Sequence, residues 1–228
     1  MAGERRRAEH GVMPSPRSLL LLFAGAFAAL AVAGCDFADD GPRTTQTRDV
    51  GTFTQIDNRG SVDVRLRVGE KQRVKVWAGE KVIDDVRTEV HNGTLEIAFD
   101  HDGWGGNDVV VEASVPKLTG IEASGSGDID ADGIKAGAFE VRSDGSADIA
   151  LAGAAETLRV SLNGSGDADL ADLNTKAASV AVSGSGNADV RADDRLMVEV
   201  DGSGDVRYHG SPALTQHVDG SGDLTHVE

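Results

Sequence analysis

Residues 160–205 read VSLNGSGDADLADLNTKAASVAVSGSGNADVRADDRLMVEVDGSGD, and Gly-Ser-Gly followed by Asp or Asn occurs three times within them. Across the C-terminal half, six copies of this motif begin at Gly125, Gly145, Gly164, Gly184, Gly202 and Gly220. Successive first glycines are 20, 19, 20, 18 and 18 residues apart. An uninterrupted repeat of about 19 residues is typical of proteins that stack equivalent segments on one another.

Apolar and polar residues alternate around every copy. Four residues before the first glycine stand Ile121, Val141, Val160, Val180, Val198 and Gln216, and four residues after it stand Ile129, Ile149, Ala168, Ala188, Val206 and Leu224. A period of two predicts extended strands with one buried face. A helix is disfavoured, because each interior glycine would cost it about 1 kcal/mol. We therefore expect a thin β-solenoid with small apolar groups inside and the Ser and Asp columns outside.

The N-terminal half predicts a second kind of β unit. Residues 62–68, 74–77 and 109–115 alternate as strands, and residues 86–90 and 95–99 flank Asn92-Gly93, a strong hairpin signal. We therefore expect an all-β chain with an N-terminal β-rich subdomain at 50–116 and a Gly-Ser-Gly-Asp repeat solenoid at 117–228. Gly60-Ser61-Val62-Asp63 resembles the motif, and if it is a degenerate copy both halves are solenoidal.

The N-terminus is read as an export signal. Arg5–Arg7 and Arg17 precede an apolar run from Leu19 to Ala33, which is short for a membrane span and typical of a signal peptide. The run ends in Val32-Ala33-Gly34-Cys35, which resembles the bacterial lipobox. We expect a signal peptide at 1–34, a lipidated Cys35, and a flexible tether at 35–49. Ordinary cleavage after Ala33, an uncleaved anchor and a buried helix are the alternatives.

Composition limits the partners and the chemistry. The chain has 22 Lys+Arg against 38 Asp+Glu, a formal net charge of −16, and removing residues 1–34 makes it more negative. Such a surface repels phosphate backbones, so no nucleic acid partner is expected. Cys35 is the one cysteine, which excludes an intrachain disulfide. Only 4% of residues are aromatic, so the core must use small aliphatic side chains.

Two polar columns accompany the repeat. The acidic column contains the candidate cation-binding residues Asp128, Asp148, Asp167, Asp205 and Asp223, with Asn187 in the remaining copy. Like charges about 4.8 Å apart repel by roughly 0.9 kcal/mol in water, so an exposed column can also exist without calcium, as a structural turn or a guard against edge association. The motif serines lack His and Asp partners at matching offsets, so no catalytic residues are expected. Their hydroxyls are expected to bond to neighbouring coils.

Together these residues resemble the family called the putative auto-transporter adhesin head GIN domain. The resemblance runs from about Val50 to Val227 and is carried by Phe53 with Ile56, by Asn92 to Ile97, by Val115-Pro116, by the repeated motifs and by Gly204 to Pro212. Ala147 and Asn187 depart from the motif. The resemblance implies a right-handed β-helical fold in a secreted or lipid-anchored bacterial protein.

The function expected from these observations is a non-enzymatic cell-envelope lipoprotein, an adhesion or scaffold module without a cofactor. The alternative is a periplasmic sensor or accessory lipoprotein that binds a protein or glycan, with or without calcium. The lipid on Cys35 would hold it on the periplasmic face of the inner membrane or on the outer membrane. A solenoid with open strand edges also leaves a homo-oligomer as an option.

Overall fold

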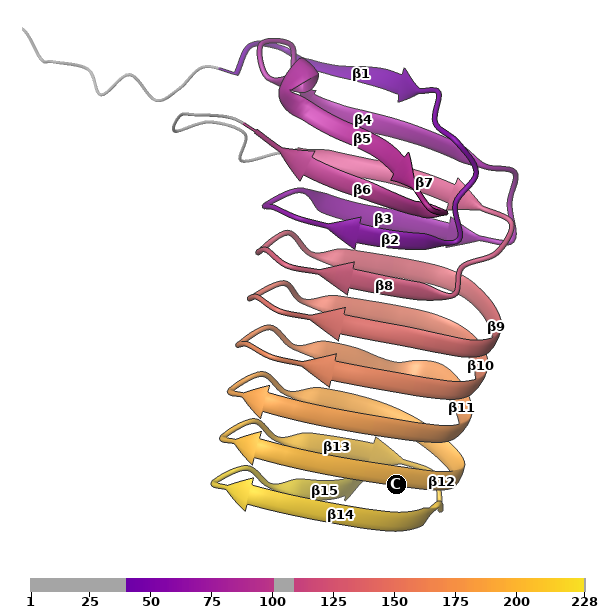
Figure 1. Cartoon of the computed structure of the whole chain (residues 1–228), viewed down its shortest axis with the longest axis vertical. Helices are drawn as coiled ribbons and strands as arrows, with labels where there is room; N and C mark the ends of the chain where they lie inside the picture. The colour runs from indigo at the N-terminus through magenta and orange to yellow at the C-terminus, as the bar shows by residue number, and fades with distance from the viewer. Residues whose placement is uncertain (1–39, 101–108, 228) are drawn as a thin grey trace, which may run out of the picture. The chain divides into compact units, whose positions relative to one another are not determined.

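The computed structural model describes residues 40–100 and 109–227, which belong to one compact unit. The predicted signal peptide and Cys35 lie outside these residues. The described chain is a β-solenoid in which successive coils stack in register (Figure 1). Its repeat part consists of β8 (Gly120–Ala123), β9 (Ile129–Ser143), β10 (Ile149–Leu162), β11 (Ala168–Gly184), β12 (Ala188–Gly202), β13 (Val206–His209), β14 (Ala213–Gly220) and β15 (Leu224–Val227). The predicted stacking of the repeats is confirmed.

Each long strand bends and contributes to two layers. The first face contains β13, β15 and the first halves of β9–β12, whereas the second face contains β8, β14 and the second halves of β9–β12. All pairing within the repeat is parallel, and Val160 lies opposite both Val141 and Val180. Each motif begins at or just after the end of one strand and stops before the next strand starts, so the motifs form turns that join the two faces.

The first coil comes from the degenerate motif. Strands β2 (Gln55–Asn58) and β3 (Asp63–Val68) pair in parallel with β8 and β9. Between them, the Gly60 carbonyl accepts a 3.0 Å hydrogen bond from the backbone N–H of Ser126, in the next motif. Both halves therefore belong to one solenoid, and residues 116 and 117 do not mark a boundary between compact units.

The N-terminal end of the stack changes from parallel to antiparallel pairing. Strands β7 (Val110–Val115) and β6 (Thr94–Phe99) continue the two faces in parallel with β3 and β2. Antiparallel strands β4 (Arg73–Gly79), β1 (Arg43–Arg48) and β5 (Val86–His91) then cover this end, with a short 3-10 turn, η1, at Ile83–Asp85. The predicted hairpin is confirmed as β5 and β6, with positive φ angles of 52° at Asn92 and 82° at Gly93.

Strand β1 corrects the expectation of a flexible tether over its residues. Arg43–Arg48 pairs along its whole length with β4, with Arg43 opposite Gly79 and Arg48 opposite Val74. The segment has no buried face, and its exposed and half-buried residues alternate. Cross-strand hydrogen bonding, instead of apolar burial, therefore orders a polar segment whose composition suggested a tether.

The core is a single column of small aliphatic side chains running through the stack. Val141, Val160, Val180 and Val198 are at most 1% exposed, as the inward alternation predicts. At the C-terminal end of the column, all residues of β14 are exposed, including Gln216. In the described parts of the chain, no helix is long and apolar enough to cross a membrane.

Candidate functional site

The acidic column forms a ladder of hydrogen bonds from side chain to backbone. In each coil the Oδ1 atom accepts a hydrogen bond from the backbone N–H of the equivalent residue in the next coil. The ladder runs from Asp63 through Asp128, Asp148, Asp167, Asn187 and Asp205 to Asp223, with N···O distances of 2.8 to 3.2 Å. The carboxylates are therefore structural acceptors at the turn.

The neighbouring backbone completes this arrangement. The N–H of Ile129 donates to the carbonyl of Asp148 at 2.9 Å, so Asp128 and Ile129 together hold both backbone polar groups of Asp148. Asn187 serves equally well, because its amide oxygen accepts the N–H of Asp205 at 3.0 Å. The described residues contain no group of three or more His, Cys, Asp or Glu side chains placed to hold a metal ion. Of the two expectations for this column, the hydrogen-bond ladder supports the structural turn, and cation binding stays the alternative that a calcium titration tests.

The serine column contacts the neighbouring coils through its backbone. The N–H of each motif serine donates to the carbonyl of a motif glycine one coil earlier, as Ser165 does to Gly145 at 3.0 Å. The motif serines themselves are exposed. Among the described residues, the hydrogen bonds found between these serines and neighbouring coils come from the backbone N–H groups and not from the expected hydroxyls.

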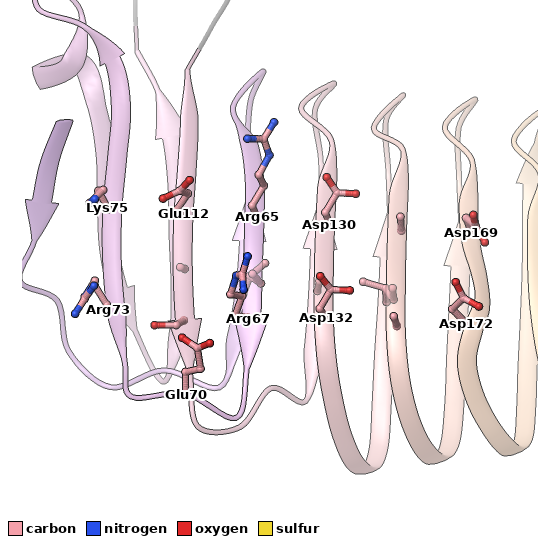
Figure 2. A pocket seen from close by; sticks show the side chains of 17 residues that line it. Arg65, Arg67, Glu70, Arg73, Lys75, Glu112, Asp130, Asp132, Asp169 and Asp172 are labelled. Atoms are coloured by element: carbon pink, nitrogen blue, oxygen red, sulfur yellow. The ribbon is translucent and has the colours of Figure 1, made fainter. Parts of the chain in front are cut away.

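A charged hollow of about 600 Å³ lies on the first face, where the N-terminal strands meet the repeat. We call it the bipolar patch. Its basic half carries Arg65, Arg67, Arg73 and Lys75 together with Glu70 and Glu112, and its acidic half carries Asp130, Asp132, Asp169 and Asp172. Figure 2 shows the side chains on the strands projecting from the same side, with Glu70 in the loop between β3 and β4. Ala150 and Ala152 on β10 separate the two pairs of aspartates and leave the surface low there.

Strand register orders the charges in the bipolar patch. Opposite one another on successive strands stand Lys75, Glu112, Arg65, Asp130, Ala150 and Asp169. Neighbouring strands are about 4.8 Å apart, so the charge along this row alternates and then becomes acidic. Arg65, Arg67 and Arg73 are exposed, and within the described chain none of them has an ion pair.

Arg59, which follows β2 on the second face, shows the contrast. Its guanidinium lies 2.6 Å from Asp57 and 3.0 Å from Glu96. The hydrogen bond from Arg59 to Asp57, followed by the attraction between their charges, raises the pKa of Arg59. Arg59 is thus held by its own chain, whereas the three patch arginines are available to an external partner.

Sequence reasoning did not identify the bipolar patch. The alternation in residues 62–68 does place Arg65 and Arg67 on an outward face. Their opposition to Asp130 and Asp132 depends on pairing between β3 and β9, which are far apart in sequence. The degenerate motif at Gly60 was the available signal, because aligning it with Gly125 also aligns Arg65 with Asp130.

The comparisons with known proteins agree with this fold. Residues 52–212 match the model of the family described as "Putative auto-transporter adhesin, head GIN domain". The chain belongs to this family. The match includes β3 and the first five of the six motifs. No curated protein matches the chain.

Two crystal structures are similar to this GIN-domain chain. One is a putative adhesin from Bacteroides fragilis, with a TM-score of 0.67 and 20% identity, covering 82% of this chain and 97% of that one. The other is a putative lipid binding protein from Parabacteroides distasonis, with a TM-score of 0.52 and 20% identity, covering 82% of this chain and 98% of that one. At these identities the similarity shows the fold alone.

Proposed function

We propose that this chain is a non-enzymatic lipoprotein of the bacterial cell envelope and acts as an adhesion or scaffold module. The observation that carries the proposal is the bipolar patch, where three exposed arginines that form no ion pair with any described residue lie beside four aspartates on one regular face. Charges arranged in this way select a partner of complementary pattern and increase its rate of association. Membership of an adhesin family supports the same reading.

The partner is a protein or glycan of the envelope that presents both signs of charge. Arg65 and Arg67 offer planar guanidinium groups that can bind carboxylates with two hydrogen bonds each. The aspartates beside them receive ammonium or hydroxyl donors. Because the strands supporting these side chains are hydrogen-bonded on both sides, the patch is held rigidly before the partner arrives.

Anchoring is proposed to occur through lipid on Cys35. Acyl chains contribute about 0.8 kcal/mol for each buried CH₂ group, so two or more chains give a stable attachment. A fatty-acid label should be incorporated into the natural chain and lost entirely in Cys35→Ala. Retention of the label in Cys35→Ala would refute the anchor and leave the patch proposal intact.

Binding is tested by crosslinking the full chain in intact cells and quantifying its crosslinked partner. The double variant R65Q/R67Q should reduce the crosslinked yield about tenfold. A tenfold loss of affinity corresponds to about 1.4 kcal/mol of binding free energy. The control R87Q/K176Q removes the same charge from two ion-paired surface residues and should leave the yield unchanged. Equal yields in both variants would exclude the bipolar patch as the binding surface.

Accessibility distinguishes an adhesin from a periplasmic accessory protein. Protease added to intact cells should degrade the anchored chain if it acts as an adhesin. Complete protection in intact cells, with degradation after outer-membrane permeabilisation, would favour the periplasmic sensor or accessory role.

A further inference from the structure

The second face carries a separate groove of about 800 Å³ across strands β9 to β12. Arg159 on β10 lies opposite Ser179 on β11, and Ser179 in turn lies opposite Met197 on β12. In the neighbouring row, Thr157 lies opposite Ala177, and Ala177 lies opposite Arg195. The small side chains on β11 therefore form a low floor between Arg159 and Arg195, which are two strands apart.

The groove is basic in an acidic protein. Lys117, Arg159 and Arg195 line it, and among the described residues that line it Glu140 is the one that is acidic. Glu140 already has an ion pair with Arg142, at 3.2 Å. Arg159 and Arg195 are exposed, and no ion pair joins either of them to another described residue. In a chain of net charge −16, such a cluster creates a local potential that attracts anions.

An apolar surface accompanies these cations. Met197 is 51% exposed, the largest exposure among the bulky hydrophobic side chains in the described regions. It lies in the groove with Ala138 and Ala177. A flexible thioether beside small side chains adapts to hydrocarbon of varied shape. The groove thus combines positive charge with an apolar contact, which fits a ligand that has an anionic head and a hydrocarbon part.

We propose that this groove binds a phosphate ester attached to an apolar chain. Arg159 and Arg195 bind the phosphate oxygens through their planar guanidinium groups, and Lys117 adds a third positive charge. Met197 contacts the hydrocarbon next to the ester. A phospholipid headgroup and a soluble alkyl phosphate share this chemistry. The site is on the second face, so it is independent of the bipolar patch and of the partner proposed for it.

The test is calorimetric titration of the full mature chain in a fixed concentration of non-ionic detergent. The probes are hexyl phosphate, dihexanoyl phosphatidic acid, inorganic phosphate and, as a cationic control, hexyltrimethylammonium. Both esters should bind saturably, inorganic phosphate more weakly, and the cation not at all. Tighter binding of dihexanoyl phosphatidic acid identifies a lipid headgroup as the source, whereas tighter binding of hexyl phosphate identifies a soluble ester.

Variants locate the site. R159Q/R195Q should weaken hexyl phosphate binding at least about tenfold, while R87Q/K176Q, with the same charge loss at two ion-paired residues outside the groove, should bind as the natural chain does. Met197→Ser should weaken hexyl phosphate and leave inorganic phosphate unchanged. Melting temperatures confirm that each variant is folded. Equal affinity in R159Q/R195Q and R87Q/K176Q, or saturable binding of the cation, would overturn the proposal.

Discussion

The backbone N–H of Asp148 donates a 3.0 Å hydrogen bond to Oδ1 of Asp128, the equivalent residue one coil earlier. The turn between the two faces interrupts the regular backbone pairing, and the aspartate side chain supplies the acceptor that this N–H would otherwise lack. The motif aspartate is thus explained by geometry. Asparagine fits the same position, because its side-chain oxygen accepts the same bond, as Asn187 shows.

This role predicts different results for two substitutions of one residue. Asp167→Ala removes the acceptor for the N–H of Asn187, which lies 2.8 Å away, and should lower the free energy of unfolding by about 1 kcal/mol. Asp167→Asn keeps an oxygen in place and should change it by less than about 0.5 kcal/mol. Urea unfolding of the full chain measures both. An equal loss in the two variants would show that the charge matters and the acceptor does not.

Calcium should have little effect on stability. One oxygen of each ladder carboxylate already accepts a backbone hydrogen bond, and Asn187 interrupts the column of charges. We therefore expect the melting temperature to stay constant as calcium rises to the millimolar range. A bound cation at a hundred times its Kd would add about 2.7 kcal/mol, a shift that melting would detect. A calcium-specific rise, lost in D148N/D167N, would instead establish the column as a cation site.

The first glycine of the motif should tolerate no side chain. A Cβ atom on Gly164 would lie 2.0 Å from the carbonyl oxygen of Gly145, a backbone atom that cannot move without separating two coils. Gly164→Ala should therefore lower the free energy of unfolding by about 1 to 3 kcal/mol, as overpacking does. Gly137→Ala is the control, because a Cβ there meets no atom within 4 Å. Similar urea midpoints for the two variants would contradict the close stacking.

The same contact explains why the sequence predicts the repeat so well. Each coil places its glycines and valines against identical groups in the next coil, so the spacing of Gly145 and Gly164 carries three-dimensional information directly. The hairpin is equally local, since Asn92 and Gly93 adopt positive φ where their residue types allow it. The sequence pattern therefore predicts the stacked elements and the direction of their side chains.

Features that depend on pairing between dissimilar segments could not be predicted in this way. Strand β1 has no apolar alternation, and its order comes from β4, which follows it by more than twenty residues. The bipolar patch requires Arg65 on β3 to lie opposite Asp130 on β9, across the junction between the N-terminal strands and the repeat. Charges on a surface have no periodic signature of their own, so their grouping appears only once the strands are placed.

A buried amide should control the junction on which the bipolar patch depends. Asn58 is 1% exposed, and its Nδ2 donates to the carbonyls of Val62 at 2.7 Å and Gly127 at 3.3 Å. These bonds fix the first coil, and with it β3, against the repeat. Asn58→Asp replaces the donor with an acceptor facing two carbonyl oxygens. It should lower the free energy of unfolding by about 3 kcal/mol at neutral pH.

The pH dependence of this variant gives a stricter test. Burial should raise the pKa of the introduced carboxyl in the folded chain above its value in the unfolded chain. Protonation of this carboxyl restores one hydrogen-bond donor. The loss of unfolding free energy in Asn58→Asp should therefore shrink as the pH falls and grow as the pH rises through the folded pKa. Asn174→Asp is the control, because Asn174 is exposed and its Nδ2 donates to the carbonyl of Gly153 at 3.3 Å. This variant should lower the free energy of unfolding by less than about 0.5 kcal/mol, with no such dependence on pH. Urea unfolding at several pH values compares the two variants. A pH-independent loss equal to that of Asn174→Asp would mean that Asn58 contributes no more than a surface residue, and that packing alone aligns β3 with β9.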